Sequence, residues 1–337
     1  MNDFAVALVG GGNIAKVHLA AAKESGGRVR IAAVVDPAAE ARDAMAREAG
    51  ISGFESIQKL LDSPVADTIR GAVIATPPNA RIPIVQALLE RGMALLVEKP
   101  IAHTLVDARK LNELAVRHSK TVTAVGYCHR FTPAIAEMKR RIDGGEIGTV
   151  SRFENTFATY LPKMREHWMS DPAISGGGSF IDTGCHSLDL FLHLLGEGQI
   201  RSATFHHAWP GRGESSATVH LRQAPEHAPG GATAGGPRAA GVIQSGWLEP
   251  GRFVVTVVGT KGSFHYDYER GTQLVYRPND GEARKIEVED HGLRFTRQLQ
   301  AFGDTADNGA RSPLASFRDG LITAALVDAA QKAAHNE

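Results

Sequence analysis

The amino-acid sequence predicts an α/β domain with a doubly wound parallel sheet, followed by an α+β domain with a mostly antiparallel sheet. Three observations support this prediction. The first third of the chain alternates short apolar runs with helical periodicity, which is typical of parallel sheets. A glycine pattern joins the first apolar run to the first helix. After residue 151 the runs become longer and contain aromatic residues, as antiparallel strands do. We expect domains 1–126 and 127–337, and we allow the C-terminal helices to pack back on the first domain.

The segment 4–37 carries the strongest signal. Its first strand, 5–9, leads directly into a G-x-G-x-x-A turn. In such a turn the first glycine allows a tight bend, the second lets a pyrophosphate approach bare backbone, and the alanine keeps the helix close to the sheet. The N-terminus of the helix offers free N–H groups to the phosphates. The residues expected to contact a dinucleotide here are Gly10, Gly12, Asn13, Ile14 and Ala15.

The first helix and the second strand complete this unit. The helix is indicated by apolar residues at helical spacing, Val17, Ala20 and Ala21. The second strand, 31–35, ends at Asp36, about twenty residues after the glycines. A carboxylate there accepts a hydrogen bond from a ribose 2′-hydroxyl and repels a 2′-phosphate, which favours NAD over NADP.

Two later strands of the first domain end in polar loops. Strand 72–75 runs into Thr76, Pro77, Pro78 and Asn79, and strand 94–97 runs into Glu98, Lys99 and Pro100. Proline cannot continue a central strand, so the chain turns at the carboxyl edge of the sheet, where ligands bind. The residues expected at the cofactor are Thr76, Pro77, Asn79, Glu98 and Lys99. A lysine at this edge is able to bond a substrate hydroxyl and to transfer a proton, although its position alone also fits a surface lysine. The remaining elements expected are helices 38–48, 56–61, 82–91 and 104–118 and strand 121–125.

The second domain is expected to contain one interrupting helix, 179–195. Its strands are predicted at 153–160, 203–209, 217–221, 242–248, 253–258 and 263–268, and its closing helices at 293–308 and 313–334. The segment 223–240 is rich in proline, glycine and alanine, so we expect a hairpin loop that contributes little to the core.

Asp182 and His186 lie four residues apart in that helix, which places them about 6 Å apart on one face. A carboxylate beside an imidazole suits a general acid or base, and an ordinary surface pair fits equally well. Gly184 between them lowers helix stability by roughly 1 kcal/mol relative to alanine, which suggests that something approaches the backbone there.

A loop just before the glycine run 176–178 contains Arg165, His167 and Trp168. A flat indole with charged neighbours suits a polyol, and a surface loop anchored by one tryptophan fits as well. We therefore consider these three residues as substrate contacts.

Composition excludes several classes of protein. Of the 337 residues, 37 are Lys or Arg and 37 are Asp or Glu, so charge does not direct the chain to nucleic acid or to an anionic membrane. Two cysteines suggest a reducing compartment. There is no apolar run long enough for a membrane span, no room for a signal peptide and no metal-ligand spacing. We expect a cytoplasmic protein without a metal.

Together these segments resemble the Gfo/Idh/MocA family, named for glucose–fructose oxidoreductase, inositol dehydrogenase and rhizopine catabolism. The resemblance covers nearly the whole chain. Its carriers are VGGGNIA at 9–15, VVDP at 34–37, ATPPNA at 75–80, VEKPIA at 97–102, GYCHRFTPAI at 126–135, GEIGTV at 145–150, GGGSFIDTGCHSLDL at 176–190 and VVGTKGSF at 257–264. The resemblance implies that Lys99, Asp182 and His186 act together at the substrate carbon facing the nicotinamide. It also implies a Rossmann domain, a C-terminal α+β domain with an open-faced sheet, and dimers or tetramers built through that sheet.

The resulting hypothesis is an NAD-dependent dehydrogenase that acts on a secondary alcohol, or the corresponding ketone, of a sugar, sugar derivative or cyclitol. One alternative is a redox-neutral sugar enzyme, such as a glycosidase, that retains its NAD. Another is a dinucleotide-sensing regulatory protein without turnover. The sequence leaves the substrate, its stereochemistry and the direction of the reaction open.

Overall fold

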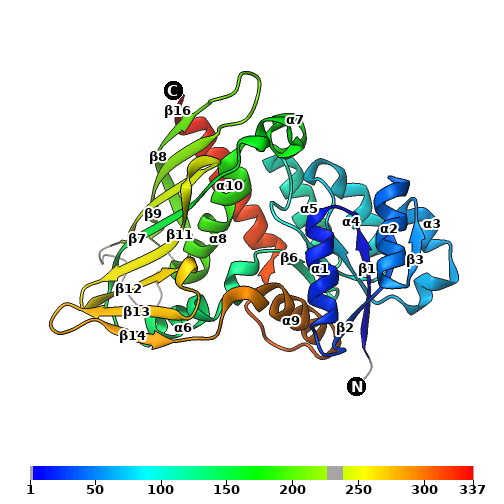
Figure 1. Ribbon diagram of the computed structural model, residues 1–337, viewed down its shortest axis with the longest axis horizontal. Helices are drawn as coiled ribbons and strands as arrows, with labels where there is room; N and C mark the ends of the chain where they lie inside the picture. The colour runs from blue at the N-terminus through cyan, green and yellow to red at the C-terminus, as the bar shows by residue number, and fades with distance from the viewer. Residues whose placement is uncertain (1–2, 226–237, 337) are drawn as a thin grey trace. The chain divides into compact units, whose positions relative to one another are not determined.

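The computed structural model describes residues 3–225 and 238–336. The chain forms two compact units. The first comprises residues 1–102, 106–128 and 293–321, and the second comprises 103–105, 129–292 and 322–337 (Figure 1). Most of the segment expected to form a hairpin loop, residues 226–237, lies outside the described residues.

The first unit is built on a sheet to which seven strands contribute within the described residues. The strand order is β15-β6-β5-β4-β1-β2-β3, and every neighbouring pair is parallel except β15 with β6. The strands are β1 (Phe4–Val9), β2 (Val29–Val35), β3 (Ser52–Phe54), β4 (Gly71–Ile74), β5 (Ala94–Val97), β6 (Thr123–Val125) and β15 (Ala315–Ser316). The helices are α1 (Asn13–Lys23), α2 (Ala39–Ala49), α3 (Ile57–Leu61), α4 (Arg81–Glu90), α5 (Leu105–Arg117) and α9 (Arg294–Asn308).

The carboxyl ends of the central strands are aligned. Val9, the last residue of β1, pairs with Val35 of β2 and with Ile74 of β4. Ile74 in turn pairs with Val97 of β5, which pairs with Val125 of β6. The loops that follow these strands therefore leave the sheet at one edge.

Helix α1 is present as predicted, but of the three apolar residues that indicated it only Ala21 is buried. Val17 is 38% exposed and Ala20 is also exposed, whereas Ala15, His18 and Leu19 are buried. The apolar pattern did not include His18 or Leu19, so it located the buried face only in part. The buried face joins a core that contains alternate residues of β1 together with Leu299 and Phe302 of α9.

The second unit contains a sheet with the order β14-β13-β12-β11-β7-β10-β9-β8-β16 in the part of the chain that the structure covers. Its pairs are antiparallel except β10 with β7 and β16 with β8. The strands are β7 (Val150–Tyr160), β8 (Gly198–His206), β9 (Ser216–Gln223), β10 (Ala240–Gly246), β11 (Leu248–Gly259), β12 (Gly262–Asp267), β13 (Gln273–Pro278), β14 (Arg284–Glu287) and β16 (Ala334–Asn336). The helices are α6 (Pro133–Asp143), α7 (Pro172–Ser175), α8 (Cys185–Leu195) and α10 (Phe317–Ala333), and α10 begins within the first unit.

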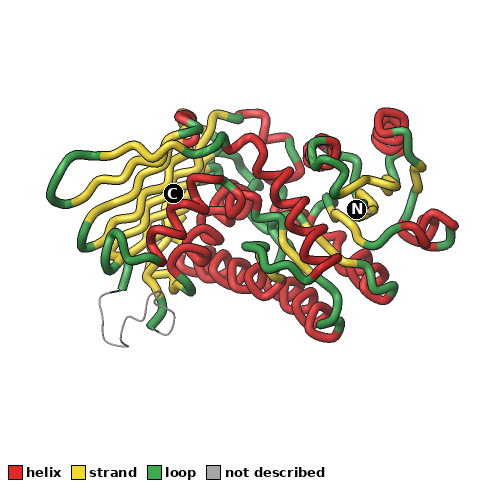
Figure 2. Tube along the Cα trace, turned by 90° about the horizontal axis from the view of Figure 1, so that it is seen from below, coloured by secondary structure: helices red, strands yellow, loops and turns green. Residues whose placement is uncertain are grey.

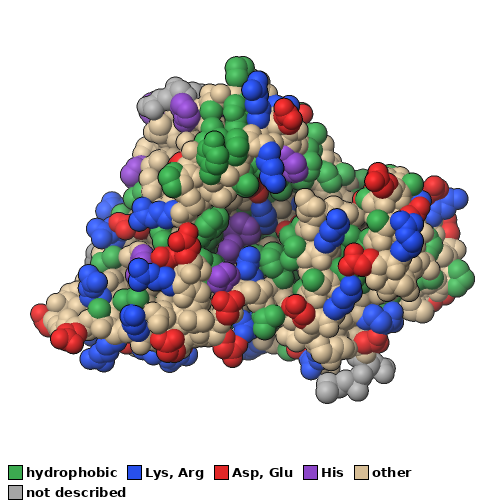
Figure 3. Space-filling model, in the orientation of Figure 1, with side chains coloured by type: hydrophobic (Ala, Val, Ile, Leu, Met, Phe, Trp, Pro, Cys, Tyr) green, Lys and Arg blue, Asp and Glu red, His purple; other side chains and the backbone are tan. Residues whose placement is uncertain are grey.

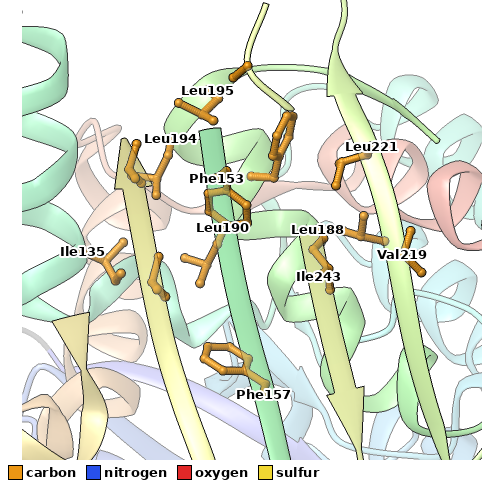
Figure 4. Packing of buried hydrophobic residues seen from close by; sticks show 14 of the residues in the cluster. Ile135, Phe153, Phe157, Leu188, Leu190, Leu194, Leu195, Val219, Leu221 and Ile243 are labelled. Carbon is orange, nitrogen blue, oxygen red and sulfur yellow. The ribbon is translucent and has the colours of Figure 1, made fainter. Parts of the chain in front are cut away.

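The core of the second unit lies between one face of this sheet and its helices. Figure 2 shows the long strands side by side as one layer. In Figure 4, side chains of α8 and Ile135 of α6 face residues of β7, β9 and β10. The labelled residues are Ile135, Phe153, Phe157, Leu188, Leu190, Leu194, Leu195, Val219, Leu221 and Ile243. This packing fixes α8, and with it the segment that leads into α8.

The predicted fold class is confirmed, and the differences are local. The strands β3, β13, β14, β15 and β16 were not predicted. β3, β15 and β16 have only two or three residues and β14 is largely exposed, whereas β13 has six residues that alternate in burial and was overlooked. The loop expected around Arg165 and Trp168 is instead two short 3₁₀ helices, Pro162–Glu166 and Trp168–Ser170.

The helix expected over 179–195 exists, but it is not a regular α-helix throughout. Residues Phe180–Gly184 form a π-helical turn, and the α-helix α8 begins at Cys185. Because a π turn is closed by i→i+5 bonds, the regular α spacing assumed for Asp182 and His186 does not hold. The close approach expected at Gly184 is present, because the ring of Phe180, from the same turn, lies against this glycine.

Candidate active site

The glycine turn between β1 and α1 has the geometry that a pyrophosphate needs. Gly10 has a φ of +104°, and a Cβ there would lie 2.8 Å from the carbonyl oxygen of Ala75. No L-residue with a side chain fits this position without strain. A Cβ on Gly12 would meet no heavy atom of the described chain within 4 Å. Asn13 and Ile14 then open α1, so bare backbone and first-turn amides lie together at this edge.

Asp36 stands beside this turn, at the end of β2. One of its carboxylate oxygens accepts a hydrogen bond from the amide of Gly11 at 2.6 Å, and the other accepts from the amide of Ala38 at 2.7 Å. These bonds hold the carboxylate at the carboxyl edge of the sheet. Its negative charge therefore lies where a ribose attached to the pyrophosphate has to pass.

The loops after β4 and β5 reach the same edge. Thr76 follows β4, and its buried hydroxyl has no hydrogen-bond partner within the described residues. Pro77 follows, and Asn79 lies in the 3₁₀ turn Pro78–Ala80. Lys99 follows β5 and is half-buried. The hydroxyl of Thr76, the unobstructed backbone of Gly12 and the carboxylate of Asp36 all lie at this edge of the sheet. Together they suit the binding of a dinucleotide.

The side chain of Glu98 lies in the interior rather than at the surface. Its Oε1 lies 2.7 Å from Nε2 of His18, and its Oε2 accepts a hydrogen bond from the amide of Lys99 at 3.1 Å. Burial alone would raise the pKa of this carboxyl, but the hydrogen bond to His18 and the electrostatic interactions with His18, Lys99 and Arg81 outweigh burial and lower the pKa. Glu98 is therefore ionised at neutral pH.

In the second unit, Asp182 lies in the π turn and His186 lies in the first turn of α8. The Oδ2 of Asp182 accepts a hydrogen bond from the indole nitrogen of Trp247, a buried residue, at 3.1 Å. This bond fixes the carboxylate from the neighbouring strands rather than from its own helix. π-Helical turns inside helices are frequent at functional sites.

His186 also has an aromatic neighbour that the sequence analysis missed. Its ring stands perpendicular to the ring of His129, with the centroids 4.6 Å apart. Nδ1 of His129 in turn lies 2.8 Å from the hydroxyl of Tyr268. His129 belongs to the motif at 126–135, so the sequence contained an indication that His129 is functional. Tyr268 follows β12, and its position in the sequence does not indicate that it lies near His129. Several histidine side chains, coloured purple, gather near the middle of the face of the molecule that Figure 3 shows.

Of the predicted substrate contacts, His167 and Trp168 are half-buried neighbours with ring centroids 5.5 Å apart, and Arg165 is exposed. Nδ1 of His167 accepts a hydrogen bond from the amide of Met169 at 3.3 Å. These two rings form a tilted pair in the second unit, where Asp182 and His186 also lie.

Other chemistries receive no support among the described residues. There, no group of three His, Cys, Asp or Glu side chains is placed to hold a metal ion. Burial raises the pKa of the Cys128 thiol to about 11, so this cysteine is not a nucleophile at neutral pH. Within the same residues no helix is both long and apolar enough to cross a membrane.

Comparison with known families and proteins agrees with this geometry. Residues 4–127 match the family model of an oxidoreductase family with an NAD-binding Rossmann fold, and residues 135–265 match the GFO/IDH/MocA C-terminal domain. The rhizopine catabolism protein MocA of Rhizobium meliloti is 35% identical over 201 residues, which cover 58% of this chain and 59% of MocA. The scyllo-inositol 2-dehydrogenase (NAD(+)) of Bacillus subtilis is 26% identical over 94% of this chain and 90% of its own.

Solved structures share the fold across the chain. Levoglucosan dehydrogenase in complex with NADH and levoglucosan superposes with a TM-score of 0.85 at 21% identity, covering 98% of this chain and 97% of that chain. An inositol dehydrogenase homologue from Azotobacter vinelandii with bound NAD+ gives a TM-score of 0.82 at 20% identity, covering 98% and 95%. Because both domain models match in order and together span most of the chain, the protein belongs to the GFO/IDH/MocA oxidoreductase family, with the NAD-binding Rossmann fold of that family over residues 4–127.

Proposed function

We propose that the protein is an NAD-dependent dehydrogenase that transfers a hydride between the nicotinamide and a secondary alcohol, or the corresponding ketone, of a sugar, sugar derivative or cyclitol. The observation that carries the proposal is the similarity to the scyllo-inositol dehydrogenase of Bacillus subtilis, which extends over nearly the full length of both proteins. The structure of levoglucosan dehydrogenase with NADH and levoglucosan is consistent with this proposal, because that protein has the same fold and binds a sugar derivative. Residues 1–126 would bind the cofactor, and residues 127–337 would bind the substrate.

We assign the cofactor contacts to the carboxyl edge of the first sheet. The pyrophosphate would lie against the glycine turn, and Asp36 would accept from the ribose hydroxyls. The loops after β4 and β5 would border the nicotinamide end. The residues assigned to the cofactor are Gly10, Gly12, Asn13, Ile14, Ala15, Asp36, Thr76, Pro77, Asn79, Glu98 and Lys99. When bound, NAD supplies the hydride acceptor.

We assign the transfer of the substrate hydroxyl proton to Lys99 and His186. Each offers a nitrogen that is able to accept a proton near neutral pH when its surroundings favour it. Asp182 would orient His186 and stabilise its protonated form. The hydrogen bond from Trp247 to Asp182 supports this role. Because Trp247 lies outside the helix that carries Asp182, the bond fixes the position of the carboxylate.

The substrate ring is assigned to the neighbourhood of Arg165, His167 and Trp168. An indole face packs on the apolar face of a sugar or cyclitol, and the imidazole and guanidinium are able to bond its hydroxyls. A polyol requires such a mixture of flat and polar groups.

Steady-state kinetics tests the assignment. NADH formation is followed by absorbance with scyllo-inositol, myo-inositol, levoglucosan and a panel of related polyols. With the best substrate, Lys99→Ala and His186→Ala should each lower kcat by roughly a hundredfold or more, the scale of general acid–base catalysis. The double variant should be little worse than the poorer single one, because residues that act as a unit are not additive.

Two substitutions serve as matched controls. Lys120→Ala and His206→Ala remove an exposed lysine and an exposed histidine, and they should leave kcat unchanged. Full activity of Lys99→Ala or His186→Ala would overturn the residue assignment. Product formation without net NADH, on a cofactor that stays bound, would overturn the dehydrogenase and identify a redox-neutral enzyme.

We further infer that the protein forms a homodimer or homotetramer through the nine-stranded sheet and acts in the cytoplasm. Cys128 and Cys185 are both buried and neither is part of a disulfide, which supports a reducing compartment. Light scattering on the purified protein tests the oligomer, since a monomeric mass at micromolar concentration would contradict it.

A further inference from the structure

Arg81, the first residue of α4, is a buried cation whose hydrogen bonds join two loops. Only 2% of its surface is exposed. Its Nε and Nη2 donate to the carbonyl oxygen of Thr76, at 3.1 and 2.8 Å. Its Nη1 donates to the carbonyl oxygens of Glu98 and Pro100. One guanidinium thus holds the loop after β4 and the loop after β5.

A second buried contact holds the β5 loop from the other side. His18 of α1 is fully buried and meets the carboxylate of Glu98 through Nε2. The other oxygen of that carboxylate accepts from the amide of Lys99. The ring of His18 is supported in turn by Phe295, whose ring is perpendicular to it at 5.7 Å. Helix α1, which begins at the glycine turn, is therefore linked to the backbone of Lys99.

We propose that Arg81 is a positioning residue for Lys99, and that the His18–Glu98 pair acts in the same way from α1. Together they fix the backbone on both sides of Lys99: the amide of Lys99 through Glu98, and the carbonyl oxygens of Glu98 and Pro100 through Arg81. The proposal rests on the proposed function, in which Lys99 handles the substrate proton.

The presence of an arginine at position 81 indicates that this residue positions the loops rather than only stabilises the fold. Burying a guanidinium is costly, and well-packed apolar residues often serve stability as well or better. What an apolar residue or a lysine cannot provide is a rigid planar fork of donors in fixed directions. The same charge also helps keep Glu98 ionised, so that its carboxylate accepts from His18 and from the Lys99 amide at once. Fixed geometry is valuable here because a misplacement of about 1 Å at a reacting group lowers rates by about a hundredfold.

The test combines Arg81→Lys with Lys99→Ala. Lysine keeps the charge but cannot reach both loops, so Arg81→Lys should lower kcat by tenfold or more while the enzyme remains folded. If Arg81 acts through Lys99, adding Arg81→Lys to Lys99→Ala should lower kcat by less than about threefold further. The kinetic isotope effect on a substrate deuterated at the reacting carbon should also rise in Arg81→Lys, because hydride transfer becomes slower relative to the other steps.

Arg91→Lys is the matched control. Arg91 lies at the other end of α4 and also donates to a carbonyl oxygen, that of Leu61, at 2.7 Å. Its substitution should leave kcat and the isotope effect unchanged. Should Arg81→Lys fail to fold, His18→Gln takes its place in the same cycle with Lys99→Ala, with the same expected coupling.

The outcomes separate the two proposals. If Lys99→Ala retains full activity, the proposed role of Lys99 is wrong, and so is positioning through it. If Lys99→Ala is impaired while Arg81→Lys keeps the wild-type kcat and isotope effect, the positioning inference alone is wrong. Additive losses in the double variant would also overturn it, because they would mean that Arg81 does not act through Lys99.

Discussion

The ring of Phe180 covers Gly184 so closely that a Cβ on the glycine would lie 2.3 Å from Cδ2 of the ring. Both residues belong to the π-helical turn that carries Asp182 and leads into α8. Phe180 is fully buried, and its ring also packs against that of Phe205, with the centroids 5.7 Å apart. The missing side chain at Gly184 is therefore what allows this turn to close.

Gly184→Ala should destabilise the protein by about 1–3 kcal/mol, the usual cost of overpacking a core, although alanine favours helices. The measurement is urea unfolding. Gly251→Ala is the control: no heavy atom of the described chain lies within 4 Å of its added Cβ, so stability should change little. A Gly184→Ala variant as stable as the parent would mean that Phe180 moves freely, contrary to the packing.

The sequence was sufficient to predict, in order, all of the first unit's sheet strands except β3 and β15, its α-helices, and the residues that follow the strands at the carboxyl edge. Parallel strands such as β1 are buried on both faces, so they appear as continuous apolar runs that local inspection detects. The turn at Gly10 is equally visible, because only glycine suits its backbone conformation.

Contacts between segments that are far apart in the sequence could not be predicted from the spacing of residues along the chain. The link from Trp247 to Asp182 joins residues 65 apart in sequence, and His129 reaches Tyr268 across 139 residues. Nor does a single sequence indicate that a helix contains a π turn, because its hydrogen bonds shift by one residue without any characteristic residue type. The helix was therefore predicted correctly, and its internal geometry was not.

Asp36 leads to a prediction on cofactor choice. Its carboxylate is fixed beside the glycine turn and would repel a 2′-phosphate, so NAD should bind at least tenfold more tightly than NADP, which is about 1.4 kcal/mol. Asp36→Ser should reduce this preference, and Asp43→Ser, which removes a half-buried acid of α2 that pairs with Arg42, should not. Fluorescence titration with both cofactors measures the two affinities. Equal affinities in the parent protein would show that Asp36 does not meet the ribose.

Gln298 and Gln300 of α9 make a matched pair for stability. Gln298 is fully buried, and neither atom of its amide group has a hydrogen-bond partner in the described part of the chain. Gln300, in contrast, donates to the carbonyl oxygen of Ser25 at 3.1 Å. Gln298→Met should therefore stabilise the protein by about 1 kcal/mol or more, and Gln300→Met should destabilise it by about 1 kcal/mol. Urea unfolding of both variants is the measurement, and a loss of stability in Gln298→Met would contradict the prediction.

His193 of α8 predicts how stability depends on pH. Burial lowers its pKa to about 3, and the positive charges of Arg130 and Lys139 act in the same direction. The unfolded chain, with a histidine pKa near 6.5, therefore binds a proton that the folded protein does not. The contribution of His193 to stability is complete above pH 6.5 and falls as the pH drops toward 3, by at most about 1.4 kcal/mol per pH unit. His193→Gln should flatten the pH dependence of the unfolding free energy between pH 6.5 and 4, whereas His206→Gln, at an exposed site on β8, should leave it unchanged. Urea unfolding at several pH values gives the slopes, and identical slopes for His193→Gln and the parent would mean that the histidine becomes protonated without unfolding.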